Sequence, residues 1–306
     1  MTAVDWTPMQ RDLPGAIRLG EPLSRHTSFH IGGPADAWAG VSNEAELLAC
    51  LAFAKSRGTA LTLLAAGTNV LVRDGGIRGM VLSLGGDFEA YSLDGTKVRA
   101  GAAMNLALLA RKTALAGLQG LEWAVGIPGS LGGALVMNAG AHGGEMKQVV
   151  RSVGLVLDDR PETWPAEACG FAYRHSRFKD LASRGSLVLT WAEMELKDAP
   201  VEELKLRMEE ALAKRKASQP LGIPNAGCVF KNPEGDSAGR MIEACGFKGR
   251  RHGGAEISPV HANFVVNTGG AKASDVLALM EEARAAVKAR FGVTLLNEVL
   301  VLGEDA

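Results

Sequence analysis

The chain has 306 residues, of which 47% are hydrophobic and 22% are charged, and its formal net charge is −1. This is the composition of an ordinary globular protein that is long enough for two or three domains. A nearly neutral chain has no overall basic field for nucleic acid or an anionic membrane surface, so any anionic ligand needs a local site.

Cysteine usage and hydropathy narrow the class of protein further. The four cysteines are far apart in sequence and form no Cys-x-x-Cys pair, which argues against a zinc site and a disulfide framework. The N-terminal residues lack the basic and then apolar pattern of a signal peptide. No stretch approaches the roughly 18 apolar residues of a membrane span. We therefore expect a cytoplasmic protein that binds no metal ion.

The first third of the chain is expected to alternate helices and short strands. Residues 1–20 are predicted to be a loosely held lead-in, and the apolar–polar alternation over 27–36 predicts a short strand that ends in a turn. The further elements are a helix over 44–57 capped by Asn43 or Ser42, a buried strand over 61–65, antiparallel strands over 79–84, 89–93 and 96–101 with a hairpin turn at Leu93-Asp-Gly-Thr96, and a helix over 105–116.

The remainder of the chain is expected to contain a long amphipathic helix over 201–217, which marks a domain boundary. Glu298 interrupts the last, apolar strand, and a carboxylate there is costly unless it is paired or functional. The other predicted elements are strands over 148–157 and 186–196 with an exposed loop over 171–179 between them, a polar turn over 225–233, a short helix over 237–245, a strand over 262–267, a helix over 273–291 and a buried strand over 293–301.

Two glycine-containing loops are candidate anion sites. The neutral stretch from Gly126 to Gly144 exposes backbone N–H groups, and the apolar Ala134-Leu-Val-Met137 predicts a buried element after it. The strand end Ala66-Gly-Thr-Asn69 offers a second set of donors. A plain turn is the alternative for each loop. The signatures of a P-loop and of a Gly-x-Gly-x-x-Gly dinucleotide site are both absent.

Eight segments of the chain resemble, in their order, the motifs of one flavoenzyme family. They are Ile31-Gly-Gly-Pro-Ala-Asp36, Ala66-Gly-Thr-Asn-Val-Leu71, Gly126-Ile-Pro-Gly-Ser-Leu-Gly-Gly133, Met137-Asn-Ala-Gly140, Tyr173-Arg-His-Ser176, Gly227-Cys-Val-Phe-Lys-Asn-Pro233, His261-Ala-Asn-Phe264 and Asn297-Glu-Val299. The resemblance is to the UDP-N-acetylenolpyruvoylglucosamine reductases and covers roughly residues 25–302. The short chain resembles their second type, which lacks an extra tyrosine-bearing loop.

This resemblance implies an α+β fold, in which an FAD-binding domain of the vanillyl-alcohol-oxidase type is followed by a smaller α+β substrate-binding domain. The expected domains are a lead-in over 1–24, an FAD-binding domain over 25–199 with subdomains of about 25–84 and 85–199, and a substrate-binding domain over 200–306. The last strand would return a catalytic Glu298 to the active site. We expect a monomer that uses small-molecule substrates and neither nucleic acid nor membrane insertion.

The implied reaction is the NADPH-dependent reduction of the enolpyruvyl ether of UDP-N-acetylglucosamine enolpyruvate to UDP-N-acetylmuramate, in peptidoglycan precursor synthesis. By resemblance, non-covalent FAD is held by the two glycine-containing loops. The residues expected to bind it are Ala66, Gly67, Thr68, Asn69, Val70, Leu71, Gly126, Ile127, Pro128, Gly129, Ser130, Gly133, Asn138, Ala139 and Gly140.

The chemistry needs donors to developing negative charge and an acid that protonates carbon. The guanidinium of Arg174 suits a carboxylate, and Glu298 would position the substrate or a proton-relaying water. Cys228 would be the acid, because a thiol with a pKa of about 8.5 is protonated at neutral pH. A small buried hydrophobe is the alternative for Cys228. The expected substrate-binding residues are Tyr173, Lys231 and Asn232.

The sequence departs from the family pattern in two places. Cys228 stands where the family usually has Ser, and Ser218 stands where a basic residue often precedes the Gln-Pro pair, with Arg215 and Lys216 just upstream. The cation that binds the substrate diphosphate is therefore left open. Two alternatives to the reductase are another FAD oxidoreductase of the same fold and a nucleotide-sugar-binding relative that has lost activity.

Overall fold

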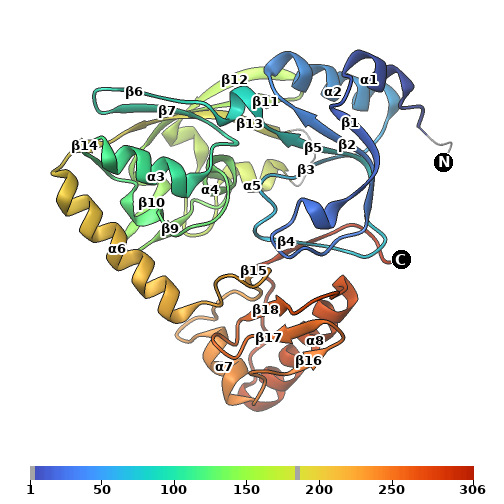
Figure 1. Cartoon of the computed structure of the whole chain (residues 1–306), viewed down its shortest axis with the longest axis vertical. Helices are drawn as coiled ribbons and strands as arrows, with labels where there is room; N and C mark the ends of the chain where they lie inside the picture. Colours follow the sequence, from blue (N-terminus) through green and yellow to red (C-terminus); the bar gives the residue numbers. More distant parts are fainter. Residues whose placement is uncertain (1–3, 183–186) are drawn as a thin grey trace. The chain divides into compact units, whose positions relative to one another are not determined.

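The computed structural model describes residues 4–182 and 187–306 (Figure 1). Residues 1–3 of the predicted lead-in and Ser186 of the predicted strand 186–196 lie outside this part. Contacts divide the chain into two compact units. Unit 1 comprises Met1–Arg18, Ala37–Ala66 and Gly79–Arg215, and unit 2 comprises Leu19–Asp36, Gly67–Arg78 and Lys216–Ala306. The predicted domain boundaries near residues 24, 84 and 199 stay a prediction.

Helices and strands occur in both units, and the fold is α+β. The α-helices are α1 (Thr7–Asp12), α2 (Glu44–Arg57), α3 (Leu106–Leu115), α4 (Leu131–Val136), α5 (Arg177–Ala182), α6 (Val201–Ser218), α7 (Ala238–Ala244) and α8 (Ala273–Phe291). Short 3₁₀ helices are η1 (Leu23–Arg25), η2 (Gly86–Glu89), η3 (Glu122–Ala124), η4 (Met146–Gln148) and η5 (Ala166–Cys169). No helix of the described residues is long and apolar enough to cross a membrane.

Within residues 4–182 and 187–306, the strands form three larger sheets and three two-stranded pairs. The larger sheets have the orders β1-β2-β5-β3, β12-β11-β13-β7-β6 and β15-β18-β17-β16, and the pairs are β10-β9, β14-β8 and β19-β4. The strands are β1 (Ile17–Pro22), β2 (Pro34–Val41), β3 (Leu61–Leu63), β4 (Val70–Val72), β5 (Ile77–Leu84), β6 (Tyr91–Asp94), β7 (Lys97–Gly101), β8 (Leu118–Gln119), β9 (Gly140–Ala141), β10 (Gly144–Glu145), β11 (Val150–Leu157), β12 (Arg160–Pro165), β13 (Leu187–Glu195), β14 (Lys197–Asp198), β15 (Asn225–Cys228), β16 (Arg251–His252), β17 (Ala255–Ile257), β18 (Phe264–Asn267) and β19 (Leu300–Leu302).

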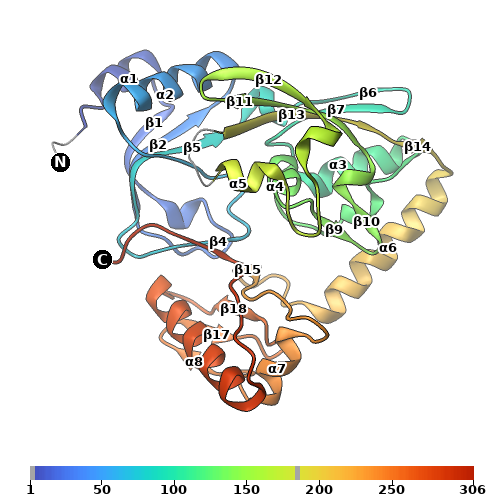
Figure 2. The ribbon, with the colours of Figure 1, turned by 180° about the vertical axis from the view of Figure 1, so that it is seen from behind.

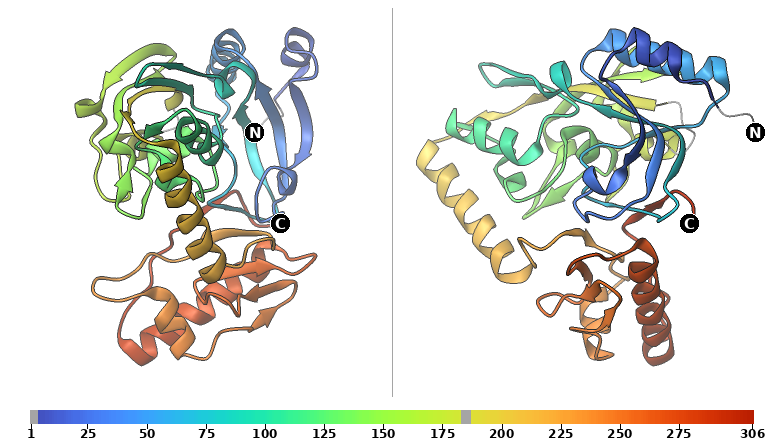
Figure 3. Two further views of the ribbon diagram at one scale, coloured as in Figure 1. Left: turned by 60° about the vertical axis from the view of Figure 1, so that its left-hand side comes forward. Right: turned by 45° about the vertical axis from the view of Figure 1, so that its right-hand side comes forward.

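The four longest predicted helices are confirmed as α2, α3, α6 and α8. Their caps or their buried faces are also those that the sequence predicts. In α2 the side chain of Asn43 accepts from the N–H of Glu46, and Gly58 ends the helix with a φ of 58°. In α3 the side chain of Asn105 plays the same role for Leu108. The buried face of α6 packs against Ala114 of α3 (Figure 3). These helices were predictable because caps and a 3.6-residue period are local features of sequence.

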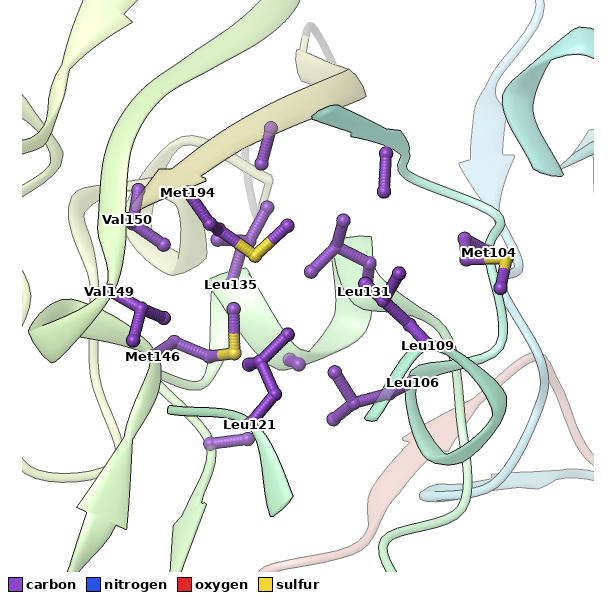
Figure 4. Close-up of a cluster of buried hydrophobic side chains, with 14 of the residues drawn as sticks. Met104, Leu106, Leu109, Leu121, Leu131, Leu135, Met146, Val149, Val150 and Met194 are labelled. Atoms are coloured by element: carbon purple, nitrogen blue, oxygen red, sulfur yellow. The ribbon is translucent and has the colours of Figure 1, made fainter. Parts of the chain in front are cut away.

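The main core of unit 1 lies beside the five-stranded antiparallel sheet. Figure 4 shows Leu131 and Leu135 of α4 pointing into the same cluster as Leu109 of α3 and Met194 of β13. The apolar element expected after the glycine-rich loop is therefore confirmed as α4. Burial of this short helix anchors the loop that precedes it, because close-packed side chains leave little room for movement.

The N-terminal region is more firmly packed than predicted. Trp6 and Met9 are only 8% and 4% exposed, and they belong to a core cluster with Leu47 and Cys50 of α2. Strand β1 also pairs within the first sheet. The prediction of a loosely held segment over 1–20 is wrong for the described residues, because two large apolar side chains are buried there.

Several predicted strands differ in the structure. The alternating segment 27–33 is a loop in which Phe29 and Ile31 are buried, and the strand begins only at Pro34. Strand β5 pairs in parallel with β3 and not with the hairpin β6–β7. The predicted buried strand 61–65 is only half-buried in β3. Alternation over a few residues does not separate a half-buried loop from a strand, and it does not specify the pairing partner.

The C-terminal prediction was also partly wrong. The segment predicted as one buried strand over 293–301 contains only the short strand β19, and Leu296 is 64% exposed. Strand β12 was not predicted, although it forms a hairpin with β11. The loop predicted over 171–179 leads into α5, where Phe178 is fully buried. Short edge elements such as these depend on their neighbours more than on their own composition.

Unit 2 packs α7 and α8 beside the sheet β15-β18-β17-β16 (Figure 2). Two carboxylate oxygens of Asp74 accept hydrogen bonds from the N–H groups of Ala273 (2.7 Å) and Ser274 (3.0 Å) at the start of α8. These two bonds satisfy orphan donors of the helix. Residues 67–78 are therefore tied to the C-terminal part of the chain, although almost 200 residues separate them in sequence.

Candidate active site

The glycine-rich loop of unit 1 is braced by the segment before α3. The carbonyl of Gly129 accepts from the N–H of Leu106 (3.0 Å), and Ser130 forms a β-bridge with Asn105. The hydroxyl of Ser130 caps α4 by accepting from the N–H of Gly133 (3.3 Å). Gly129 has a φ of 120°, which favours glycine. The loop therefore has a fixed main-chain conformation.

The residues of this loop fit the diphosphate of a flavin. Gly126 and Gly129 are half-buried, so part of their main chain is accessible, and the loop has no acidic side chain. The guanidinium of Arg215 donates to the carbonyl of Gly126, and a Cβ added to Gly126 would lie 3.1 Å from the Cδ of Arg215. A larger residue at position 126 would force the side chain of Arg215 to shift by a few tenths of an ångström. The N–H of Ile127 already donates to the carbonyl of Ala124 (2.9 Å), and Pro128 has no N–H. A phosphate at this loop would therefore depend on Arg215 and on the other N–H groups of the loop.

Asn138 was predicted to bind the cofactor, and the structure gives its side chain partners within unit 1. Its Nδ2 donates to the Oε2 of Glu145 (2.8 Å) and to the carbonyl of Ala172 (3.0 Å), and its Oδ1 accepts from the N–H of Lys147 (3.0 Å). The residue is only 2% exposed. A cofactor contact by Asn138 stays a prediction, but its amide group already has three partners.

Arg174, which was predicted to be catalytic, lies in a tight turn. Ala172 and His175 exchange backbone hydrogen bonds of 2.9 and 3.2 Å across this turn, and Arg174 has a φ of 52°. Tyr173 is 85% exposed, and the guanidinium carbon of Arg174 lies 5.7 Å from the centre of its ring. The turn thus presents an aromatic and a cationic side chain together, and a role for either in binding substrate stays a prediction.

In unit 2, the loop 67–71 is fixed by close backbone packing. Gly67 has a φ of 62°, and a Cβ there would lie 2.1 Å from the carbonyl oxygen of His26, so only glycine fits. The carbonyl of Gly67 accepts from the N–H of Ser28 (3.0 Å), and the hydroxyl of Ser28 donates to Asn225 (2.6 Å). Ser28 therefore joins this loop to the strand that ends at Cys228, a role that sequence reasoning missed.

The same unit brings the segments of Asn69, Cys228 and Glu298 together. The carbonyl of Val229 accepts from the N–H of Glu298 (2.9 Å), and the Nδ2 of Asn69 donates to the carbonyl of Glu298 (3.4 Å). The N–H of Leu300 donates to the carbonyl of Asn69 (3.0 Å). Cys228 and Glu298 are both half-buried. Three of the predicted segments thus form one hydrogen-bonded cluster.

Asn263 holds the strand of Cys228 in place, although its motif carried no role in the sequence analysis. Its Oδ1 accepts from the N–H of Phe230 (3.0 Å), and its Nδ2 donates to the carbonyl of Phe230 (2.8 Å). Its own carbonyl accepts from Val229 (2.9 Å). Asn263 is 1% exposed. The signal in the sequence was an amide residue at the start of the largely apolar segment 262–267, because a buried amide must be hydrogen-bonded. In the structure Asn263 lies in the turn just before β18.

Lys231 and Asn232, both predicted to bind substrate, are exposed. The N–H of Lys231 donates to the carbonyl of Leu296 (2.9 Å), which leaves the ammonium side chain at the surface. The Oδ1 of Asn232 accepts from the N–H of Ala238 at the start of α7 (3.1 Å). Asn232 therefore has a structural contact, and its predicted contact with substrate stays a prediction.

Two of the other three cysteines are more deeply buried than Cys228. Cys50 and Cys169 are fully buried, and this burial raises the pKa of their thiols to about 12 and about 11. Cys245 is half-buried, as Cys228 is. Cys228 and Cys245 are therefore the two thiols within reach of a reagent, which matters for any test by alkylation.

The predicted site residues are divided between the two units. Unit 1 carries Arg174 with Tyr173 and the cofactor residues Gly126, Ile127, Pro128, Gly129, Ser130, Gly133, Asn138, Ala139 and Gly140, together with Ala66. Unit 2 carries Cys228, Lys231, Asn232, Glu298 and the cofactor residues Gly67, Thr68, Asn69, Val70 and Leu71. Each set is assembled by contacts inside its own unit.

Two protein-family models match the chain. An FAD binding domain matches residues 35–160, and the C-terminal domain of UDP-N-acetylenolpyruvoylglucosamine reductase matches residues 219–302. The protein is therefore a flavoprotein in which the FAD-binding part precedes a family-specific C-terminal part. This confirms the predicted fold class and the predicted FAD.

Known reductases are similar to this chain over nearly its full length. The chain is 47% identical to a UDP-N-acetylenolpyruvoylglucosamine reductase of Heliobacterium modesticaldum (98% of this chain, 95% of the relative) and 46% identical to one of Symbiobacterium thermophilum (95% and 94%). The solved reductase of Thermus caldophilus is 37% identical and superimposes with a TM-score of 0.81 (94% and 100%). The chain belongs to the UDP-N-acetylenolpyruvoylglucosamine reductase family of FAD-dependent oxidoreductases.

Proposed function

We propose that this chain carries out the reaction of its family with the residues that it places in two clusters. The reaction is the NADPH-dependent reduction of UDP-N-acetylglucosamine enolpyruvate to UDP-N-acetylmuramate, a step of peptidoglycan precursor synthesis. The observation that supports the proposal is the hydrogen-bonded cluster of Asn69, Val229 and Glu298. Its bonds join a predicted cofactor loop to the backbone of the segments that carry the candidate acid Cys228 and Glu298.

The cofactor-binding residues are the main-chain groups of the loops 67–71 and 126–130. When FAD is bound there, it supplies a hydride acceptor for NADPH and a hydride donor for the enolpyruvyl group. The accessible backbone at Gly126 and the guanidinium of Arg215 suit the diphosphate. Because Arg215 is assigned to the flavin diphosphate, a different cation must bind the diphosphate of the substrate. The exposed Lys231 is our candidate for this role.

Arg174 binds the substrate carboxylate in this proposal. Hydride addition to the methylene carbon places negative charge on the adjacent carbon, and this charge spreads onto the carboxylate. A guanidinium stabilises that charge through two parallel hydrogen bonds. The exposed ring of Tyr173 next to Arg174 offers a face for the sugar or the nucleotide.

Cys228 donates the proton to the adjacent carbon, and Glu298 orients the substrate or a water molecule that relays the proton. A half-buried thiol is accessible to substrate, and it is held by a strand whose next residue, Val229, bonds to Glu298. Because the thiolate left behind is a stable anion, the transfer is favourable at neutral pH.

Two measurements test the proposal against its alternatives. Purified protein should show the absorption bands of bound FAD, and NADPH oxidation should depend on UDP-N-acetylglucosamine enolpyruvate. A flavoprotein that oxidises NADPH equally well without this substrate would favour another oxidoreductase of the same fold. A colourless protein that cannot be reconstituted with FAD would favour a nucleotide-sugar binder. Both results would contradict the proposal.

We further propose that residues 200–306 bind the substrate and that the enzyme acts as a monomer in the cytoplasm. Its role in peptidoglycan synthesis would link it to cell shape and cell division. A sedimentation experiment with and without substrate tests the oligomeric state, since a dimer would sediment with twice the mass of 32.1 kDa.

A further inference from the structure

The turn that carries Arg174 is tied to the glycine-rich segment by two buried polar side chains. The Nδ2 of Asn138 donates to the carbonyl of Ala172 (3.0 Å), and the hydroxyl of Ser176 donates to the carbonyl of Val136 (2.7 Å). Asn138 is 2% exposed and Ser176 is fully buried. The turn over 172–175 is therefore held at both of its ends, by the last residue of α4 and by Asn138 just after this helix.

The turn needs such support because its conformation is unfavourable. Arg174 has a φ of 52°, in the left-handed region that a residue with a long side chain rarely adopts. Asn138 itself has a φ of 40°, and asparagine tolerates this region better than most residues. A strained residue persists only where its surroundings determine its conformation.

The charges around Asn138 also act on Arg174. The carboxylate of Glu145 accepts from Asn138 (2.8 Å) and forms an ion pair with the Nζ of Lys147 (2.8 Å). The pKa of Glu145 is lowered, first by the hydrogen bond from Lys147 and also by the hydrogen bond from Asn138 and the charges of Lys147 and Arg174. Because the Nδ2 of Asn138 donates both to Glu145 and to the carbonyl of Ala172, the carboxylate of Glu145 lies close to the turn of Arg174.

We propose that Asn138 is a positioning residue for Arg174, whose amide group holds the turn of Arg174 in its strained conformation beside the carboxylate of Glu145. This inference rests on the proposed role of Arg174 in binding the substrate carboxylate. It assigns Asn138 to the substrate half-reaction, whereas the sequence analysis assigned it to FAD. The two assignments predict different results for the same variant.

Asn138→Gly is the sharpest variant, because glycine adopts a φ of 40° without strain and loses only the amide group. FAD content and the rate of flavin reduction by NADPH should stay within about twofold of wild type. Reoxidation by the enolpyruvyl substrate in stopped flow should slow by about 10- to 100-fold, since small displacements of a binding group cost that much. Asn138→Asp, which keeps the acceptor for Lys147 and loses both donors, should show the same pattern.

A double-mutant cycle separates positioning from general destabilisation. In an Arg174→Ala background, Asn138→Gly should slow reoxidation by less than about threefold, because the group that it positions is gone. Asn43→Ala is the matched control: it removes an amide cap of α2 in the same unit and should leave both half-reactions unchanged.

Three results would overturn the inference. Loss of FAD in Asn138→Gly, with normal reoxidation after reconstitution, would make Asn138 a cofactor residue. Full additivity with Arg174→Ala would show that Asn138 acts independently of Arg174. Normal reoxidation by Arg174→Ala alone would contradict the proposed role of Arg174 and, with it, the inference. If Asn138→Gly does not fold, the same comparison is made with Asn138→Asp.

Discussion

At the scale of single residues, Cys228 is the departure from the family pattern with a direct chemical consequence. Cys228→Ser should keep substantial activity, because a hydroxyl of similar reach can pass the proton. Cys228→Ala should accept electrons from NADPH and stall in the second half-reaction, with a loss of about 100- to 10,000-fold. Stopped-flow reoxidation measures this loss. Full turnover by Cys228→Ala would leave a bound water as the acid.

Alkylation provides an independent test of Cys228. Iodoacetamide should inactivate the enzyme, and the substrate should protect it. The thiols of Cys50 and Cys169 are protected by burial and a raised pKa, so Cys245 is the thiol that must be controlled. Cys245→Ala should remain sensitive and Cys228→Ser should be resistant. Inactivation of Cys228→Ser at the wild-type rate would place the sensitive thiol elsewhere.

Arg174 and Glu298 lie in different units, and both are proposed to act on the substrate. Changing either residue to Ala should leave flavin reduction by NADPH nearly intact. Reoxidation by the enolpyruvyl substrate should slow by orders of magnitude, and one lost charge-stabilising donor typically costs about 100- to 1,000-fold. Separate rate measurements of the two half-reactions check this. Equal slowing of both would indicate a structural role for the residue.

At the scale of elements, the loop before α4 combines a fixed conformation with the proposed flavin diphosphate. Gly129→Asp adds a negative charge to a loop that should bind phosphate, and it strains a backbone with a φ of 120°. Gly129→Ala introduces the strain without the charge and is the matched control. We expect FAD content to fall much further in Gly129→Asp than in Gly129→Ala. Equal flavin content in the two folded variants would argue against a diphosphate at this loop.

At the scale of the whole molecule, His261 links stability to pH. Its pKa is lowered, chiefly by burial, and its Nδ1 accepts from the N–H of Asn263 (3.2 Å), which requires the neutral ring. The folded state therefore binds fewer protons than the unfolded state. The contribution of neutral His261 to the free energy of unfolding is fully present above the ordinary histidine pKa of about 6.5. It is lost as the pH falls from there toward the lowered pKa of His261 in the folded protein.

The corresponding measurement compares wild type with His261→Gln in denaturant unfolding between pH 8 and pH 5. The stability advantage of the wild type should shrink as the pH falls below about 6.5, because only the wild type has this imidazole to protonate. The test uses only how the difference in unfolding free energy between wild type and variant changes with pH, so the absolute stability of the variant does not affect it. A difference that is independent of pH would show that His261 does not titrate between the folded and unfolded states.

The division into units also shows what local sequence does not encode. The hydrogen bonds between Asn69 and residues 298–300, and between Ser28 and Asn225, each join segments about 200 or more residues apart. No spacing rule in the sequence indicates these pairs, because they arise when separate segments pack together. The segments 19–36 and 67–78 therefore fold with the C-terminal residues.

The sequence by itself determined the long helices, the existence of a hairpin turn within Leu93–Thr96, the family and the FAD cofactor, because caps, periodicity and ordered motifs are local. The structure places the two turn residues at Gly95 and Thr96, since Asp94 still pairs with Lys97. Only the tertiary structure decided that 27–33 is a loop, that the last strand is short, and that Asn138 and Asn263 have internal partners. Whether a side-chain amide binds a ligand or braces a neighbouring turn depends on which backbone groups lie beside it. That information exists only once the chain has folded.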